Sequence, residues 1–133
     1  MEKIDHIGIA VVDLKQAIAK YEKVLDRLCY KTESVISENV KTAFLRIGES
    51  KIELLEAMDK NGPIADFLAR RGEGVHHIAY EVIDIYSEIE RFKAQGFRVL
   101  NDKPRKGADN KLVCFIHPKD CHGVLTELVQ SIK

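Results

Sequence analysis

The stretch DHIGIAVVDL at residues 5–14 returns in altered form as HHIAYEVIDI at residues 76–85. The offset of 71 residues aligns His6 with His77 and Asp13 with Asp84. The same offset aligns residues 43–45 (AFL) with 114–116 (CFI), and a later slip to 74 aligns residues 52–55 (IELL) with 126–129 (TELV). The chain is therefore a duplicated half-domain, and each half supplies one histidine near its start and one glutamate near its end.

Length and composition favour one ordinary globular domain. The 133 residues can bury a core without disulfides, and 21 basic residues balance 21 acidic ones, so charge gives no reason to expect nucleic acid or a membrane as partner. The three cysteines are odd in number and lack the spacing of a metal knuckle, which favours reduced thiols. Met1 leads directly into a strand-like segment without a signal peptide or a membrane-length apolar run, so we expect a cytoplasmic protein.

The periodicity predicts the order β-α-β-β-β in each half. In the first half, Asp13 caps a helix whose apolar positions continue to Leu28, between strands at 3–12, 29–37, 40–47 and 51–56. In the second half, Asp84 caps a helix that Gly96 closes, between strands at 75–82, 98–100, 112–116 and 124–130. We predict a single α+β domain over 1–133, with modules 1–56 and 74–131 joined by a connector at 57–73 that holds a short helix, 64–71.

Strand alternation predicts which polar side chains can meet. His6 shares a face with Gly8 and Ala10, and His77 shares a face with Ala79, so we expect both histidines to face a cavity. Glu53 and Glu127 lie in apolar strands, where a carboxylate is costly unless it is paired or bound to a metal. Any one of these residues is most simply read as structural, but two matched His and Glu positions favour a shared site. Two imidazoles and two carboxylates suit a first-row divalent metal, and on an octahedral ion they leave two positions open.

These residues resemble the vicinal oxygen chelate superfamily, the glyoxalase/bleomycin-resistance fold, over essentially the whole chain. The resemblance implies paired βαβββ modules that form a half-open, eight-stranded, barrel-like sheet around a metal. It also implies that His6, Glu53, His77 and Glu127 are the ligands, since they match the family's positions on the first and last strands of each module. The dioxygenases and metal-dependent fosfomycin-resistance enzymes of the superfamily typically have histidine where this chain has Glu53, which argues against both.

Two enzyme families of the superfamily remain. The segment IELLEAMDKNGPIADFLARRGEGVHHIAYEVIDI (52–85) and the segment HPKDCHGVLTEL (117–128) resemble methylmalonyl-CoA epimerase. The His/Glu/His/Glu ligand set resembles glyoxalase I, also called lactoylglutathione lyase. Loop residues depart from the usual epimerase sequence at 37–40 (SENV), 108–110 (ADN) and His122. Because these loops could line the channel for the acyl-CoA, the sequence favours glyoxalase I, with methylmalonyl-CoA epimerase as the alternative. A small-molecule-binding protein without catalysis is a further alternative.

Both reactions begin when a carboxylate removes a proton from a carbon next to a carbonyl. By resemblance to glyoxalase I, we predict that Glu127 is the catalytic base and that Glu53 is its counterpart. The short chain resembles the enzymes that use Ni²⁺ or Co²⁺ rather than Zn²⁺. The expected partners are a thiol-linked small molecule, either a glutathione hemithioacetal or an acyl-CoA, and a second copy in a homodimer. The basic segment 103–107 (KPRKG) could bind anionic groups of such a substrate, although a solvated loop is the simpler interpretation.

Overall fold

The structure is a computed structural model and describes residues 1–132. The chain divides into two compact units, which we call the first unit (residues 6–76) and the second unit (residues 1–5 with those from 77 onward). Each unit combines a strand, a helix and three further strands in that order, so the predicted α+β class and the β-α-β-β-β repeat are confirmed. The predicted connector helix is also present, and it belongs to the first unit.

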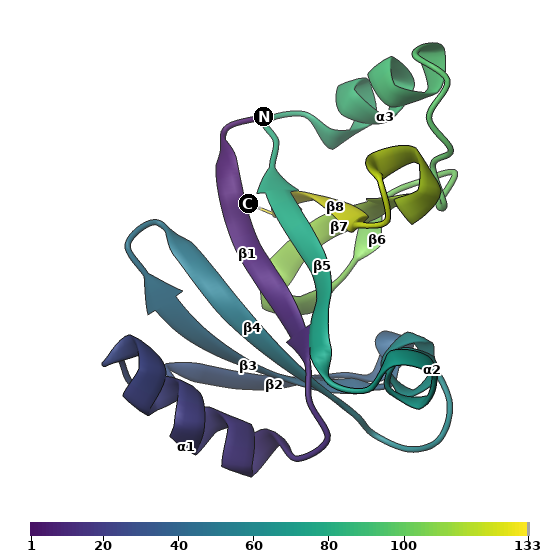
Figure 1. Ribbon diagram of the computed structural model, residues 1–133. Coiled ribbons are helices and arrows are strands. Elements are labelled where there is room, and N and C mark those ends of the chain that lie inside the picture. Colours follow the sequence, from purple (N-terminus) through teal and green to yellow (C-terminus); the bar gives the residue numbers. More distant parts are fainter. Residues whose placement is uncertain (133) are drawn as a thin grey trace. The chain divides into compact units, whose positions relative to one another are not determined.

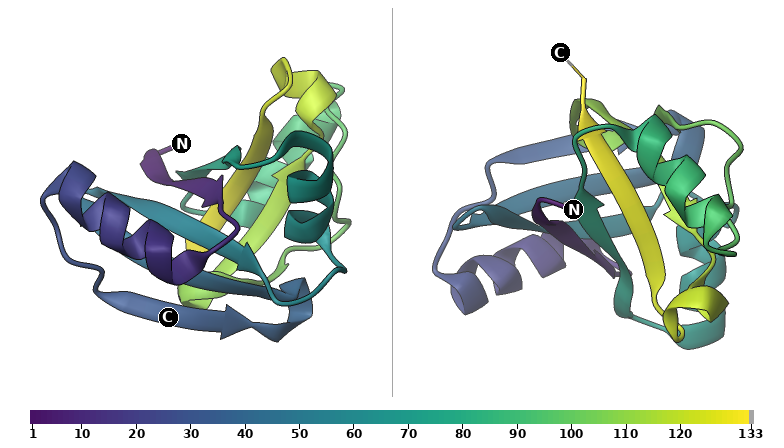
Figure 2. Two further views of the ribbon diagram at one scale, coloured as in Figure 1. Left: turned by 60° about the horizontal axis from the view of Figure 1, so that its bottom comes forward. Right: turned by 90° about the horizontal axis from the view of Figure 1, so that it is seen from above.

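In the first unit, one helix covers one face of a four-stranded sheet. The elements are β1 (Lys3–Ala10, of which residues 6–10 lie in this unit), α1 (Leu14–Leu25), β2 (Lys31–Val35), the 3₁₀ turn η1 (Ile36–Glu38), β3 (Val40–Ile47), β4 (Ser50–Ala57) and α2 (Pro63–Arg71). The strand order is β2-β3-β4-β1, in which β1 runs parallel to β4 and the other pairs are antiparallel. Helix α1 lies along this sheet (Figures 1 and 2), which leaves the other face for the polar residues described below.

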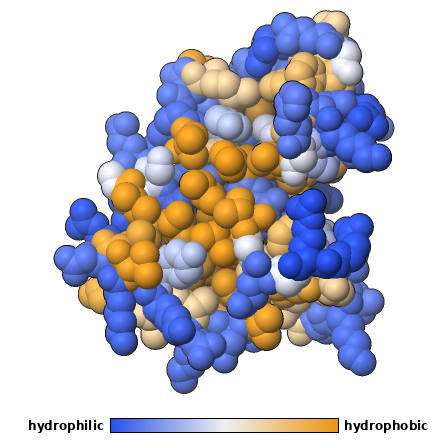
Figure 3. Space-filling view, viewed as in Figure 1, coloured by the Kyte–Doolittle hydropathy of each residue, from blue (hydrophilic) through white to orange (hydrophobic). Residues whose placement is uncertain are grey.

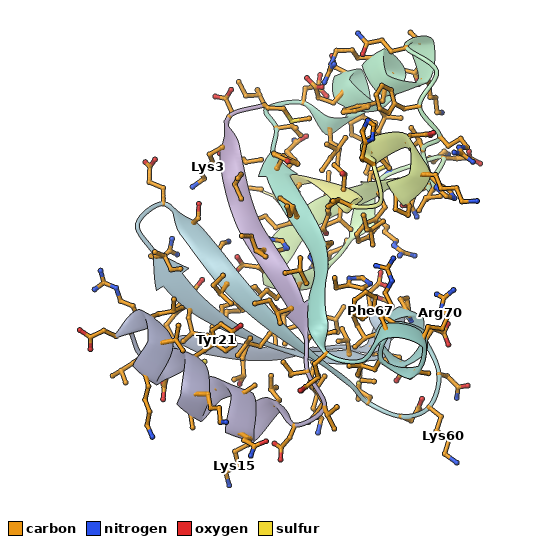
Figure 4. All side chains as sticks on the ribbon, viewed as in Figure 1. Lys3, Lys15, Tyr21, Lys60, Phe67 and Arg70 are labelled. Carbon is orange, nitrogen blue, oxygen red and sulfur yellow. The ribbon has the colours of Figure 1, made fainter. Side chains whose placement is uncertain are left out.

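Local sequence explains where α1 begins and ends. The carboxylate of Asp13 accepts a hydrogen bond of 3.1 Å from the backbone N–H of Gln16, as the predicted cap requires. Tyr21 points from the helix toward the strands, and hydrophobic residues gather there while charged residues project outward (Figures 3 and 4). The helix ends when Asp26 adopts a left-handed φ of 52°. The expectation that Leu28 continues the buried face is wrong, because this residue lies beyond the turn and is 80% exposed.

The second unit repeats this plan. Its elements are β5 (Gly74–Glu81, of which residues 77–81 lie in this unit), α3 (Ile85–Ala94), β6 (Arg105–Lys106), the 3₁₀ turns η2 (Ala108–Asn110) and η3 (Pro118–Cys121), β7 (Lys111–Ile116) and β8 (Leu125–Ser131). The strand order is β5-β8-β7-β6, with β5 parallel to β8. Asp84 caps α3 by accepting hydrogen bonds from two backbone N–H groups of the first turn. Ile85, Ile89 and Phe92 then pack the helix against Ile116 and Leu128.

One predicted strand is wrong. Residues 98–100 make only a single bridge, Val99 to Ile116, and the strand that pairs with β7 is instead β6, Arg105–Lys106. The carboxylate of Asp120 takes the backbone N–H of Arg98, so pairing of this segment is limited to the hydrogen bonds from His117 N–H to the Arg98 carbonyl and from Leu100 N–H to the Phe115 carbonyl. Among the described residues, no helix is long and apolar enough to cross a membrane.

Candidate metal-binding site

In the first unit, the parallel pairing of β1 with β4 brings His6 and Glu53 together. The register places Glu53 opposite Gly8. Gly8 is two residues after His6 on β1, so His6 and Glu53 lie on the same face of the sheet. His6 Nε2 lies 3.2 Å from Glu53 Oε1, and the two residues are only 6% and 4% exposed.

The second unit builds the same pair from the equivalent strands. Glu127 lies opposite Ala79, which is two residues after His77 on β5, so His77 and Glu127 lie on the same face of the sheet. His77 Nε2 lies 3.1 Å from Glu127 Oε1, and these residues are 5% and 6% exposed. The four residues selected from the sequence therefore form two buried His–Glu pairs, one in each unit, with the same strand geometry.

A phenylalanine supports each glutamate from the adjacent antiparallel strand. Phe44 on β3 is opposite Glu53, and Phe115 on β7 is opposite Glu127. The Phe115 ring meets the His77 imidazole edge to face, with centroids 6.1 Å apart, and so restricts the orientation of that ring. The repeat thus extends from the polar pairs to the side chains that pack around them.

The spacing within each pair fits two neighbouring ligands of one metal ion. A nitrogen and an oxygen each about 2.1 Å from an octahedral ion, at right angles to each other, lie about 3 Å apart. The observed separations are 3.2 Å and 3.1 Å, with Nε2 of each imidazole directed at the carboxylate. Buried imidazole and carboxylate groups are also the donors that divalent first-row metals prefer. The residues present therefore fit a divalent metal.

Polar residues outside the two His–Glu pairs make ordinary structural contacts. The ring of His76 meets Phe67 edge to face at 5.1 Å, and His117 Nδ1 accepts a hydrogen bond from the backbone N–H of Lys119. In the basic segment 103–107, residues 105–106 form the exposed strand β6. Lys111 Nζ lies 2.9 Å from Ser131 Oγ and 3.7 Å from Asp5 Oδ1.

Two lysines beside the first pair were missed by the sequence reasoning. Lys51 is two residues before Glu53 on β4 and shares its face, yet it is only 5% exposed. Lys31 on β2 is opposite Phe44, and the ammonium groups of Lys31 and Lys51 lie 5.7 Å and 5.9 Å from the centre of the Phe44 ring. The alternation that places Glu53 also places Lys51 on its face, so the sequence carried a signal for this residue.

Comparison with known proteins agrees with this geometry. Residues 5–115 match the model of the glyoxalase/bleomycin resistance protein/dioxygenase superfamily. The chain belongs to this superfamily. The resemblance inferred from the repeated His and Glu residues is thereby confirmed.

Among characterised relatives, epimerases of acyl-CoA compounds are prominent. The ethylmalonyl-CoA/methylmalonyl-CoA epimerase of Cereibacter sphaeroides is 40% identical over 96% of this chain and 97% of that protein. The human mitochondrial methylmalonyl-CoA epimerase is 37% identical, over 97% of this chain and 74% of the human protein. A variant of the Streptomyces coelicolor methylmalonyl-CoA epimerase, solved in complex with 2-nitronate-propionyl-CoA, is 40% identical with a TM-score of 0.96, covering 100% of this chain and 99% of that one.

A glyoxalase relative is more distant. The "Probable lactoylglutathione lyase" of Vibrio cholerae is 28% identical over 97% of this chain and 91% of that protein. The comparisons therefore support the alternative predicted from the sequence, methylmalonyl-CoA epimerase, better than the leading prediction of glyoxalase I. The loop departures at 37–40, 108–110 and His122 are weak evidence against an epimerase, because surface loops vary more among relatives than the strands that carry a site.

Proposed function

We propose that this protein is a metal-dependent methylmalonyl-CoA epimerase. The observation that carries the proposal is the combination of two buried His–Glu pairs with near full-length similarity to epimerases of methylmalonyl-CoA. The substrate would be an acyl-CoA whose C2 lies between a thioester carbonyl and a free carboxylate. Glyoxalase I remains the second candidate, supported by the glutamate at position 53, which gives the four-ligand set His6, Glu53, His77 and Glu127.

We further propose that both pairs hold one divalent ion, with all four side chains as ligands. The equivalence of the two pairs supports this arrangement. Four protein ligands on an octahedral ion leave two positions for oxygen atoms of the substrate. Such a six-coordinate site favours Ni²⁺ or Co²⁺ over Zn²⁺, for which tetrahedral sites are typical. The bound ion supplies a Lewis acid that stabilises negative charge developing on oxygen.

The two glutamates would then move the proton. Glu127, as base, takes the C2 proton of one epimer, and the electron pair of the C–H bond passes into an enolate of the thioester. Glu53, as the acid in this direction, returns a proton to C2 from the opposite face, which inverts the configuration. The reverse reaction exchanges these roles, so each glutamate serves one epimer as base and the other as acid. His6 and His77, whose Nε2 atoms lie 3.2 Å and 3.1 Å from Glu53 and Glu127, would bind the ion beside the glutamates.

A direct comparison of two substrates tests the proposal. Apo-protein is loaded with Co²⁺ or Ni²⁺ and assayed in parallel on methylmalonyl-CoA and on the hemithioacetal of methylglyoxal with glutathione. We expect turnover of methylmalonyl-CoA by the wild type and its loss in His6→Ala and His77→Ala. The control variant His117→Ala, which replaces a histidine in a surface turn, should remain active. Turnover of the hemithioacetal alone would refute the epimerase and establish the second candidate. Restoration of activity by Zn²⁺ alone would refute the preference for nickel or cobalt.

The expected homodimer is part of the proposal, since pairing is frequent in this superfamily. Light scattering coupled to size-exclusion chromatography measures it directly. A mass of about twice the 15.1 kDa chain is expected, and a mass equal to one chain would contradict the expectation.

A further inference from the structure

The two units differ in charge at one equivalent position beside the His–Glu pairs. In the first unit, the residue opposite His6 is Lys51, whereas in the second unit the residue opposite His77 is Leu125. The ligand positions are symmetric, so this lysine makes the two sides chemically different. A site that binds a substrate with two different ends needs such a difference to bind it in one orientation.

The surroundings of Lys51 suit an anion. Its stem is buried on the face that carries Glu53, and its ammonium group lies 5.9 Å from the centre of the Phe44 ring. Lys31 places a second ammonium group 5.7 Å from the same ring; its side chain is 37% exposed and its Nζ also lies 3.5 Å from Glu33 Oε1, so it contributes less than Lys51. Two cations thus lie on one aromatic ring, next to a metal-ligand pair. The charge difference that the strand register establishes is therefore the one between Lys51 and Leu125.

We propose that Lys51, assisted by Lys31, binds the free carboxylate of the acyl-CoA substrate and so determines specificity for dicarboxylic acyl-CoA. An ammonium group has three N–H donors, so Lys51 can bind a substrate carboxylate in addition to a protein acceptor. Charge-assisted hydrogen bonds of this kind are among the stronger contacts that a protein makes to a carboxylate. The inference rests on the proposed epimerase, and it explains how a nearly symmetric site distinguishes the carboxylate from the thioester.

The test compares two CoA thioesters that differ only in the carboxylate. Malonyl-CoA and propionyl-CoA are titrated by calorimetry into cobalt-loaded wild type, Lys51→Met and Lys41→Met. Methionine keeps the length of the lysine stem, and Lys41 is an exposed lysine on the opposite face of β3. Loss of one charge-assisted contact should weaken malonyl-CoA binding at least about tenfold in Lys51→Met, with propionyl-CoA binding and the Lys41→Met control unchanged.

The inference would be overturned if Lys51→Met weakened the binding of both thioesters equally, or weakened neither. It would also be overturned if the wild type bound the two thioesters equally well. If Lys51→Met does not fold, Lys31→Met replaces it, because this partly exposed lysine can be changed without opening the core. That variant should lose at least about threefold of the preference for malonyl-CoA, and an unchanged preference would overturn the proposal. If the wild type epimerises methylmalonyl-CoA but Lys51→Met keeps the full preference for malonyl-CoA over propionyl-CoA, this inference alone is refuted. Wild type without epimerase activity would refute the proposed function.

Discussion

Replacing Glu127 by glutamine should stop proton removal from one epimer of methylmalonyl-CoA and spare it for the other. Glutamine keeps an oxygen where Glu127 Oε1 lies, 3.1 Å from His77 Nε2, so the donor geometry survives while the basic carboxylate is lost. Loss of a general base costs about 10²- to 10⁴-fold in rate. Because Glu53 occupies the equivalent position in the first unit, it should still remove the proton from the opposite epimer.

The assay follows exchange of the C2 proton with deuterium oxide by mass spectrometry, starting from each pure epimer. The Glu127→Gln variant should exchange one epimer about 10²- to 10⁴-fold more slowly than wild type, and Glu53→Gln should show the opposite preference. Glu90→Gln, on the exposed surface of α3, should behave as wild type. Metal content is measured on every sample to separate loss of base from loss of the ion. Equal slowing of both epimers in both variants, with metal retained, would refute the two-base account.

Three further predictions concern stability and reactivity. Asp84→Ala removes the cap of α3 and should cost about 1 kcal/mol, a fall in Tm of about 3–6 °C by calorimetry; an unchanged Tm would contradict it. Burial raises the pKa of the Cys114 thiol, so iodoacetamide should modify Cys29 and Cys121 of the native protein before Cys114, and equal rates would count against this. Hydrogen bonds from Arg98 lower the pKa of Asp120 to about 2, below its unfolded value of about 3.9. Asp120→Asn should therefore lower Tm at pH 6, and the loss should shrink as the pH falls toward 2. A loss of Tm that stays constant with pH would refute this.

The predictable parts of the fold are those that local chemistry decides. Asp13 and Asp84 both precede an apolar helical pattern, and a carboxylate there satisfies N–H groups that the helix leaves open. The pairs His6–Glu53 and His77–Glu127 were predictable because strand alternation fixes the face of each side chain, and the repeat showed that the two halves share one geometry.

The errors came from contacts between residues distant in the sequence. The sequence of residues 98–100 suits a strand, but the carboxylate of Asp120 takes the backbone N–H of Arg98, and the segment makes a single bridge to β7. Leu28 follows the helical spacing, yet the left-handed turn at Asp26 carries it out into solvent. No local sequence pattern predicts either the Arg98–Asp120 ion pair or the left-handed turn at Asp26. Lys51 was missed for another reason: a lysine in a strand is usually exposed, although alternation places this one on the face of Glu53 and the register places it opposite His6.

The most direct test of the central claim is one incubation of pure (2S)-methylmalonyl-CoA with cobalt-loaded protein in deuterium oxide. If the two His–Glu pairs serve an epimerase, the product should carry one deuterium at C2 and reach an equal mixture of the two epimers, whereas apo-protein should leave the substrate unchanged. Substrate that keeps both its proton and its configuration in the presence of stoichiometric metal would contradict the account.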